Sequence, residues 1–303
     1  MLRRKAPPLL GIKAWINTKP LKIEDLEGKV VVIDFWTYSC VNCLRSLVKL
    51  KKLWEAYKDK GLIILGVHTP EFKFESDEGN VEEACKRLGV EWPVALDADY
   101  QTWNAYQNHY WPHHFLVDTG GYIIWDHKGE GGEAELEEEI RKLLKVDSDP
   151  VVKVEAVVPE GPITPETYCG KKKNPGLGSV QACTKEGCDH ADPEVHSPGV
   201  LYPLGSWVQE EEYLESKGGT LIIPYTAGEA NLVFEGSGEI EVLLDGKAVP
   251  LDKRGKHVVE KGGKTVVVVD HPDMYNLVKG SVGTHELSLK IPKGMRAYAY
   301  TFA

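Results

Sequence analysis

Apolar residues change their spacing part-way along the chain, and this change divides the sequence into two halves. Before residue 146, continuous apolar runs alternate with segments in which apolar residues recur every three or four positions. The run Val30–Phe35 is typical of a strand buried in a central sheet. After it, Leu47, Leu50 and Trp54 fall on one face of a helix. This alternation of strands and helices predicts an α/β domain.

Beyond residue 146 the pattern changes to short runs of β-forming residues. From Thr220 onward these runs recur about every ten residues, and Asp245-Gly246 between two of them is a hairpin signal. This spacing predicts an antiparallel β sandwich or jelly roll. A proline-containing stretch between the halves is typical of a connector, and its short β-type run, Val151–Val158, would pair with one of the sheets. The predicted divisions are an α/β domain over 1–146, a connector over 147–165 and an all-β domain over 166–303.

A pair of cysteines lies where the first strand gives way to the first helix. In Cys40-Val41-Asn42-Cys43, the first cysteine falls at the helix start, where unpaired N–H groups and the helix dipole stabilise a thiolate. Cys43 lies about one turn further on, placed to attack a mixed disulfide and release a reduced substrate. Such a pair beside a βαβ pattern predicts a redox-active disulfide, with no cofactor and no metal. A zinc site would need a second CxxC or a His pair at matching spacing, and none follows nearby.

Asp34 lies within the apolar strand, six residues before Cys40. A carboxyl buried at that point would pass a proton to and from the Cys43 thiol. The alternative is an aspartate at a strand end that faces water.

A proline precedes a later strand, in Tyr110-Trp111-Pro112-His113-His114. A cis proline there would expose the backbone of Trp111 for strand-like pairing with a peptide substrate, and one of the two histidines would contact that substrate. The alternative is an ordinary turn proline.

Residues 1–146 resemble thioredoxin-fold domains of the TlpA-like branch, and specifically the soluble part of DipZ-type thiol:disulfide oxidoreductases. The resemblance implies that Cys40 is the nucleophile, Cys43 the resolving thiol and Asp34 the buried acid. It also implies a cis Pro112 next to Trp111 in the substrate-binding loop. The matching stretches are Gly11–Asn17, Asp34–Arg45, Gly66–Phe72 and Tyr110–Pro112.

Three neighbouring side chains are candidates for supporting roles. His68 would tune the site electrostatically or serve in packing. Arg45 would stabilise a thiolate or face solvent. Trp36, in the same matching stretch as the cysteines, is the third.

The resemblance extends to the second half of the chain and to partners. The ends of the β domain, 165–168 and 297–302, resemble the C-terminal domain of DipZ-type proteins, which looks like a carbohydrate-binding module. Trp207, Tyr213 and Tyr225 would line a glycan platform there or belong to the core and edges. Disulfides and dithiols of other proteins are the implied substrates, and a membrane protein of the CcdA type is the implied electron donor.

One departure from ordinary thioredoxin lies between the two cysteines. Val41-Asn42 stands there in place of Gly-Pro. These two residues influence the redox poise of the pair, so the direction of electron flow stays open.

Charge and hydropathy exclude several other classes of protein. The net charge is −10 and both halves are acidic, which argues against nucleic acid or an anionic membrane as a partner. No apolar run approaches the roughly 18 residues that cross a bilayer, and the basic start of the chain is followed by no apolar region. We therefore expect a soluble protein, cytoplasmic as the sequence stands, or extracytoplasmic if it is the excised soluble part of a membrane protein.

Cys169, Cys183 and Cys188 lie within a stretch that has no periodic apolar pattern. Such a stretch has little core of its own, so a covalent or metal link is favoured. We expect a disulfide that joins Cys169 to Cys183 or Cys188, because it closes the longer loop. A zinc site that uses Cys169 and one of His190 and His196, or free thiols, are the alternatives.

The leading functional prediction is a thiol:disulfide oxidoreductase, and two others compete with it. Thr37-Tyr38-Ser39-Cys40 satisfies the TxxC pattern of a thiol peroxidase, although Ile33 stands where peroxiredoxins place a proline. A glycan- or protein-binding module with a vestigial dithiol is the second alternative. The joint presence of Cys40, Cys43, Asp34 and Pro112 argues against the second.

Overall fold

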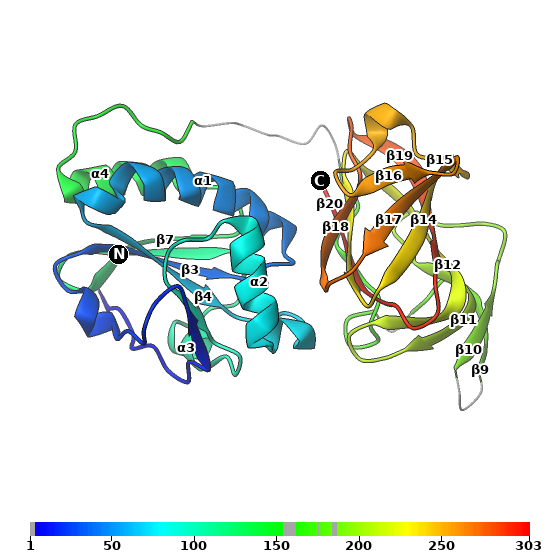
Figure 1. Ribbon diagram of the computed structural model, residues 1–303, viewed down its shortest axis with the longest axis horizontal. Helices are drawn as coiled ribbons and strands as arrows, with labels where there is room; N and C mark the ends of the chain where they lie inside the picture. The colour runs from blue at the N-terminus through cyan, green and yellow to red at the C-terminus, as the bar shows by residue number, and fades with distance from the viewer. Residues whose placement is uncertain (1–3, 154–161, 175, 184–186) are drawn as a thin grey trace. The chain divides into compact units, whose positions relative to one another are not determined.

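The computed structural model describes residues 4–153, 162–174, 176–183 and 187–303. It divides into two compact units, Met1–Ala156 and Val157–Ala303 (Figure 1). None of the helices within the described residues is both long enough and apolar enough to cross a membrane.

The first unit is built on a mixed sheet with the strand order β1-β7-β6-β3-β4-β5-β2. Strands β3, β4 and β5 run parallel, and β6 and β7 form an antiparallel hairpin beside β3. The strands are β1 Arg4–Lys5, β2 Ala14–Ile16, β3 Val30–Trp36, β4 Leu62–His68, β5 Val94–Leu96, β6 His113–Val117 and β7 Tyr122–Lys128.

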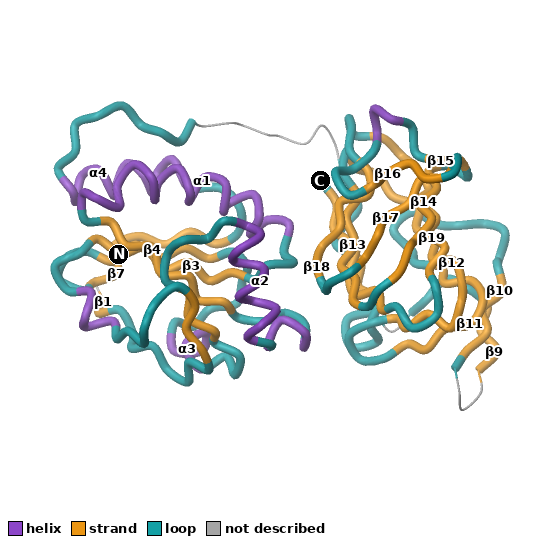
Figure 2. Tube along the Cα trace, in the orientation of Figure 1, coloured by secondary structure: helices purple, strands orange, loops and turns teal. Residues whose placement is uncertain are grey.

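Helices cover this sheet on both faces, with α1 and α4 on one face and α3 on the other (Figures 1 and 2). Phe35 of β3 packs edge-on against Trp103 of α3, with 5.9 Å between ring centroids. Because side chains alternate along a strand, Asp34 and Trp36 point to the opposite face, beneath α1. The helices are α1 Val41–Tyr57, α2 Glu78–Leu88, α3 Gln101–Ala105 and α4 Glu133–Leu144, with 3₁₀ turns at Ile23–Leu26, Lys58–Lys60 and Lys73–Ser76.

The second unit is an antiparallel β domain. Its longest strand, β12, pairs with β11, β19 and β20 and so links two groups of strands, β16-β17-β14-β19-β12-β11-β10-β9 and β18-β13-β20-β8. The strands are β8 Thr167–Tyr168, β9 Val180–Cys183, β10 Cys188–Ala191, β11 Tyr202–Gln209, β12 Leu214–Ala227, β13 Ala230–Glu235, β14 Gly238–Leu244, β15 Lys247–Ala248, β16 Val258–Lys261, β17 Lys264–Val269, β18 Asp273–Val278, β19 Gly283–Ile291 and β20 Arg296–Phe302, with a 3₁₀ turn at Leu251–Lys253.

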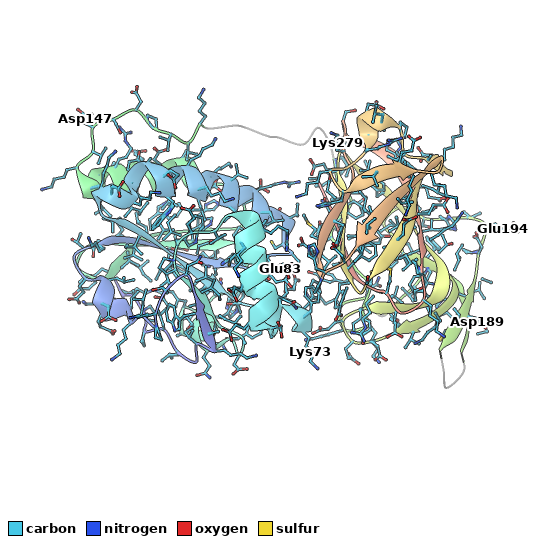
Figure 3. The ribbon with its side chains drawn as sticks, in the orientation of Figure 1. Lys73, Glu83, Asp147, Asp189, Glu194 and Lys279 are labelled. Carbon is cyan, nitrogen blue, oxygen red and sulfur yellow. The ribbon has the colours of Figure 1, made fainter. Side chains whose placement is uncertain are left out.

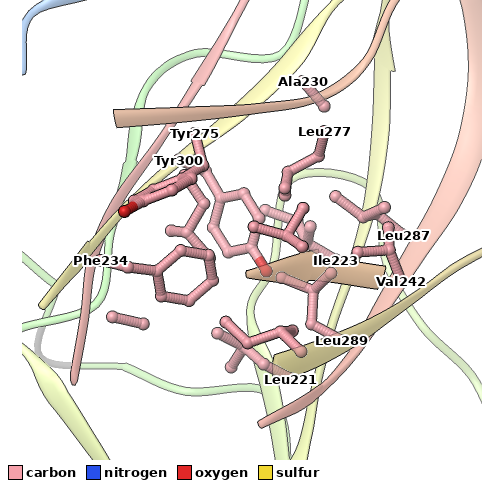
Figure 4. Close-up of a cluster of buried hydrophobic side chains, with 14 of the residues drawn as sticks. Leu221, Ile223, Ala230, Phe234, Val242, Tyr275, Leu277, Leu287, Leu289 and Tyr300 are labelled. Atoms are coloured by element: carbon pink, nitrogen blue, oxygen red, sulfur yellow. The ribbon is translucent and has the colours of Figure 1, made fainter. Parts of the chain in front are cut away.

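The core of the second unit lies between these two groups of strands (Figure 4). Ile223, Val242 and Leu289 come from the first group, and Phe234 and Tyr300 from the second; all are buried. Charged side chains point outward into solvent from both units. Figure 3 labels Lys73, Glu83, Asp147, Asp189, Glu194 and Lys279 among them.

The predicted fold class, an α/β domain followed by an all-β domain, is confirmed. The pairing predicted for Val151–Val158 is not seen at 151–153, which form no strand, and residues 154–161 lie outside the described residues. Instead, the backbone N–H groups of Val151 and Val152 donate to the Glu137 carboxylate of α4, each over 2.7 Å. The sequence pattern also missed β9, β10 and β11.

Candidate active site

Cys40 and Cys43 lie at the start of α1, immediately after β3. Cys40 is the N-cap residue of α1, and its sulfur accepts a hydrogen bond from the Cys43 N–H over 3.3 Å. Both cysteines are free thiols, and Cys40 is half-buried whereas Cys43 is buried. The more accessible sulfur is therefore the one at the N-cap of the helix.

The Cys43 thiol is held in its protonated form by its surroundings. Burial raises its pKa well above the usual value, and the neighbouring Cys40 and the negative charge of Asp34 act in the same direction. A backbone hydrogen bond from Thr37 opposes this shift. A thiol of this kind becomes a nucleophile only when a nearby base accepts its proton.

Asp34 is a buried carboxyl in the centre of β3, 2% exposed. It lies opposite His114 of β6 in the antiparallel ladder, and its Oδ1 is 3.2 Å from His114 Nε2. Although this distance fits an ion pair, the approach lacks hydrogen-bond geometry, so we treat it as a close polar contact between two buried titratable groups. The alternative that Asp34 faces water is wrong.

The loop before β6 lies against Cys40. The Trp111–Pro112 peptide bond is cis, as the resemblance implied. The Trp111 carbonyl oxygen lies 4.0 Å from the Cys40 sulfur, and the Trp111 indole N–H donates to the Thr69 carbonyl over 2.9 Å. The loop thus places a backbone carbonyl next to the accessible thiol.

The two histidines after this proline are buried, so the expectation that one of them contacts substrate is wrong. His113 is 2% exposed, and its Nδ1 lies 2.7 Å from Asn108 Oδ1 and its Nε2 lies 3.1 Å from Asp126. Burial lowers the pKa of His113 to about 4. His114 is fully buried beside Asp34. Strand β6 is covered on both faces, which is why neither side chain reaches the surface.

The supporting candidates have separate surroundings. His68 is fully buried, stacks on Tyr38 at 5.6 Å between centroids, and has its pKa lowered to about 3 by burial. It is therefore neutral near pH 7 and supplies packing rather than charge. Trp36 is buried and packs edge-on against His68. Arg45 forms an ion pair with Glu130 at 3.4 Å.

Sequence reasoning missed a buried polar cluster next to the dithiol. Glu75 is fully buried and accepts hydrogen bonds from the hydroxyls of Thr37 and Ser39. Both hydroxyls come from the turn directly before Cys40. Thr37 and Ser39 lie within the matching stretch Asp34–Arg45. Nothing in the sequence indicates, however, that this turn contacts a carboxylate from the 3₁₀ turn at 73–76.

The cysteines of the second unit differ from the prediction. Cys169 is a free thiol buried in the apolar core, so its assignment to a disulfide is wrong. Cys188 is disulfide-bonded and lies opposite Cys183 in the β9–β10 ladder, while the side chain of Cys183 lies outside the described residues. The stretch is not an irregular loop, because β9 pairs antiparallel with β10, and β10 pairs in turn with β11.

The remaining predictions for the second unit are a zinc site and a glycan platform. No group of three metal-binding side chains occurs among the residues that the structure describes. His190 lies instead 2.7 Å from the Ser179 hydroxyl. Trp207 and Tyr225 are fully buried and belong to the core, which leaves the half-buried Tyr213, beside Arg296, as the remaining candidate for a glycan platform.

The sheet order, the dithiol at the start of α1 and the facing proline loop define the first unit as a thioredoxin-fold domain. A family model described as Redoxin matches residues 12–144, and one described as Thioredoxin like C-terminal domain matches residues 164–303. The chain is therefore similar to TlpA/DipZ-type proteins over both of its units, and its first unit has the thioredoxin fold.

Among the proteins with related sequences, one is named DipZ and two are named thiol-disulfide oxidoreductases. Protein DipZ of Mycobacterium tuberculosis is 33% identical over 98% of the chain, and the chain spans 42% of that relative's length. Thiol-disulfide oxidoreductase YkuV of Bacillus subtilis is 27% identical over 47% of the chain and 96% of the relative. Thiol-disulfide oxidoreductase ResA of Bacillus thuringiensis is 29% identical over 42% of the chain and 71% of the relative.

Proposed function

We propose that the protein exchanges electrons between its Cys40–Cys43 pair and disulfides of other proteins. The observation that carries this proposal is that the two sulfurs differ in their exposure to solvent and in their pKa. Cys40 is accessible at the helix start, and Cys43 is buried with its pKa raised. Cys40 would attack a substrate disulfide, and Cys43 would then resolve the mixed disulfide.

The steps of this exchange balance without a cofactor. The Cys40 thiolate attacks one substrate sulfur, the substrate disulfide breaks, and the released thiolate takes up a proton. Cys43 then loses its proton to Asp34 and attacks the Cys40 sulfur, which closes the Cys40–Cys43 disulfide and expels the second substrate sulfur as a thiolate. This thiolate takes up the proton from Asp34 and leaves as a thiol. The substrate gains two electrons and the dithiol loses them.

The loop at Trp111 and Pro112 is proposed to bind the substrate backbone beside Cys40. The position of the Trp111 carbonyl near the Cys40 sulfur supports this role. An extended substrate strand placed there would bring its cysteine to the accessible thiol.

Electrons are proposed to reach the dithiol from a membrane donor of the CcdA type. Support comes from the resemblance to DipZ-type proteins, one of which is 33% identical over 98% of the chain. A purified donor of this class should reduce the oxidised Cys40–Cys43 pair, and a failure to reduce it would remove this part of the proposal.

An insulin-reduction assay with dithiothreitol as the electron source tests the proposed function. We expect the wild-type chain to accelerate insulin reduction and the Cys40→Ser variant to be inactive. Consumption of peroxide by the same samples separates the thiol peroxidase alternative. The Thr37 hydroxyl, which that alternative would use, donates to Glu75 over 2.5 Å. Rapid peroxide consumption without insulin reduction would contradict the proposal.

A further inference from the structure

A buried carboxylate connects two separate segments next to the dithiol. Glu75 lies in the 3₁₀ turn Lys73–Ser76 and is fully buried. Its Oε1 accepts hydrogen bonds from the hydroxyls of Thr37, over 2.5 Å, and Ser39, over 2.6 Å. Its Oε2 accepts from the backbone N–H groups of Glu71, over 2.6 Å, and Phe72, over 2.8 Å. Four donors satisfy both oxygens of an ionised carboxylate, which is what burial of a charge requires.

Two of these donors belong to the turn that sets the position of both active-site sulfurs. Thr37 and Ser39 lie between the end of β3 and Cys40. The Thr37 carbonyl accepts a hydrogen bond from the Cys40 N–H over 3.4 Å, and the Thr37 backbone also hydrogen-bonds to Cys43. A displacement of this turn would therefore move or reorient the dithiol.

We propose that Glu75 is a positioning residue for the dithiol: its carboxylate fixes the Thr37–Ser39 turn and thereby holds the Cys40 sulfur ready for attack. This role deepens the proposed function and rests on it. Among the contacts of the described residues, Glu75 connects to the sulfurs through Thr37 and Ser39, so it acts by geometry and not by contact with the reacting atoms.

The position of the turn is also expected to depend on pH, because Glu75 can gain or lose a proton near neutral pH. Burial raises the pKa of Glu75 to about 7, against the opposing hydrogen bonds from Ser39, Thr37 and Phe72, so both of its forms are populated near neutral pH. The titratable side chains that face this cluster are His68, whose Nε2 lies 3.3 Å from the Thr37 hydroxyl, and Glu71, whose charge raises the pKa further. His68 is neutral in this range because its pKa is about 3.

A proton on Glu75 must change the turn. The Thr37 hydroxyl has one proton, which it gives to the ionised carboxylate while it accepts from the His68 Nε2–H. When Glu75 carries a proton on Oε1, that oxygen becomes a donor and one of the two hydroxyls must turn away from it. The turn before Cys40 therefore has two hydrogen-bond arrangements, selected by the protonation of Glu75.

Two substitutions separate the contact from the charge. In Glu75→Gln, the amide oxygen can face the two backbone N–H groups while the amide nitrogen donates to the two hydroxyls, so the turn stays in place without titrating. Glu75→Ala removes all four hydrogen bonds. Glu137→Gln is the matched control, because Glu137 is also buried and accepts from one hydroxyl, that of Tyr57, and from two backbone N–H groups.

The experiment measures the rate of Cys40 alkylation by limiting iodoacetamide from pH 5.5 to 8.5, with the labelled cysteine identified by mass spectrometry. For the wild type we expect a second inflection near pH 7 that changes the rate by about 3- to 10-fold. This inflection should vanish in Glu75→Gln and persist in Glu137→Gln. Glu75→Ala should react about tenfold more slowly than the wild type at pH 7.5.

Superimposable profiles of the wild type and Glu75→Gln would overturn the proposal, and so would wild-type reactivity in a folded Glu75→Ala variant. If circular dichroism shows that Glu75→Ala is unfolded, the Glu75→Gln profile decides alone. Alkylation needs no protein substrate. A chain that fails to reduce insulin yet shows the predicted profiles would therefore contradict the proposed function and leave the positioning role standing.

Discussion

At the scale of single residues, the site depends on carboxyl groups that the fold has removed from water. Asp34 lies beneath the dithiol next to His114, and Glu75 lies beneath the turn before it. Burial raises the pKa of Glu75, so its protonation depends on its immediate partners. The two carboxyls have different tasks: Asp34 would exchange a proton with Cys43, and Glu75 would fix the position of Cys40.

Replacement of Asp34 by Asn is expected to slow the release of reduced substrate by about tenfold or more, because Cys43 loses its proton acceptor. The domain should remain folded, since Asn has nearly the same shape. Insulin turnover measured from pH 6 to 9, with circular dichroism as a check of folding, tests this. Turnover equal to that of the wild type throughout this range would show that Asp34 is not the acceptor.

The Glu75 carboxyl is expected to make stability depend on pH. Its pKa is raised from 4.5 to about 7 in the folded protein, so between these values the folded chain keeps a proton that the unfolded chain has lost. The stabilisation from the protonated form is therefore complete below about pH 4.5 and is lost as the pH rises through 7. Over this range it amounts to about 3 kcal/mol.

Urea unfolding of the wild type and Glu75→Gln at several pH values measures this effect. Tryptophan fluorescence reports mainly on the first unit, which holds seven of the eight tryptophans. His68 acts in the opposite direction, because its lowered pKa weakens the fold as the pH falls below 6.5, but it is common to both variants. A stability difference that stays constant with pH would contradict the assignment.

At the scale of elements, the sequence predicted most strands and helices and missed those whose pattern was irregular. The CxxC pair after Val30–Phe35 located β3 and α1 because both have strong apolar periodicity. Strand β11 was missed because Pro203 and Gly205 interrupt its apolar residues, and Gly205 has φ of 88°, a left-handed conformation. The role of Glu75 could not be predicted, since it depends on a contact between segments distant in sequence.

Strand β17 offers a test of the core of the second unit at this scale. Val267 is fully buried and its neighbour Val268 is 54% exposed, so the two side chains point to opposite faces. Val267→Ala is expected to destabilise the second unit by about 2 kcal/mol, whereas Val268→Ala should cost much less. Both substitutions lose the same strand propensity, so their difference isolates burial. Scanning calorimetry measures the stability of both variants. Equal losses of stability would show that Val267 is not a core residue.

At the scale of the whole molecule, the proposed chemistry belongs to one of two separately packed units. Each unit has its own hydrophobic core, and Cys40, Cys43, Asp34 and Pro112 all lie in the first. The second unit offers buried aromatics, a free buried Cys169 and a disulfide at Cys188. The second unit is therefore expected to contribute to partners and stability rather than to disulfide exchange.

A fragment of residues 1–156 is accordingly expected to reduce insulin within about twofold of the full chain, because the second unit supplies none of the proposed catalytic groups. The comparison uses equal concentrations of folded protein, with Cys40→Ser in both lengths as the inactive control. A loss of more than about tenfold in the fragment would mean that the second unit contributes to the insulin reaction.

The central claim is that Cys40 attacks and Cys43 resolves, and trapping tests it most directly. Reduced Cys43→Ser protein is mixed with a disulfide-containing protein substrate, and the covalent products are mapped by mass spectrometry. The account predicts a stable mixed disulfide at Cys40 in this variant and none in Cys40→Ser. Accumulation of a mixed disulfide at Cys43 in the Cys40→Ser variant, with none at Cys40 in Cys43→Ser, would contradict it.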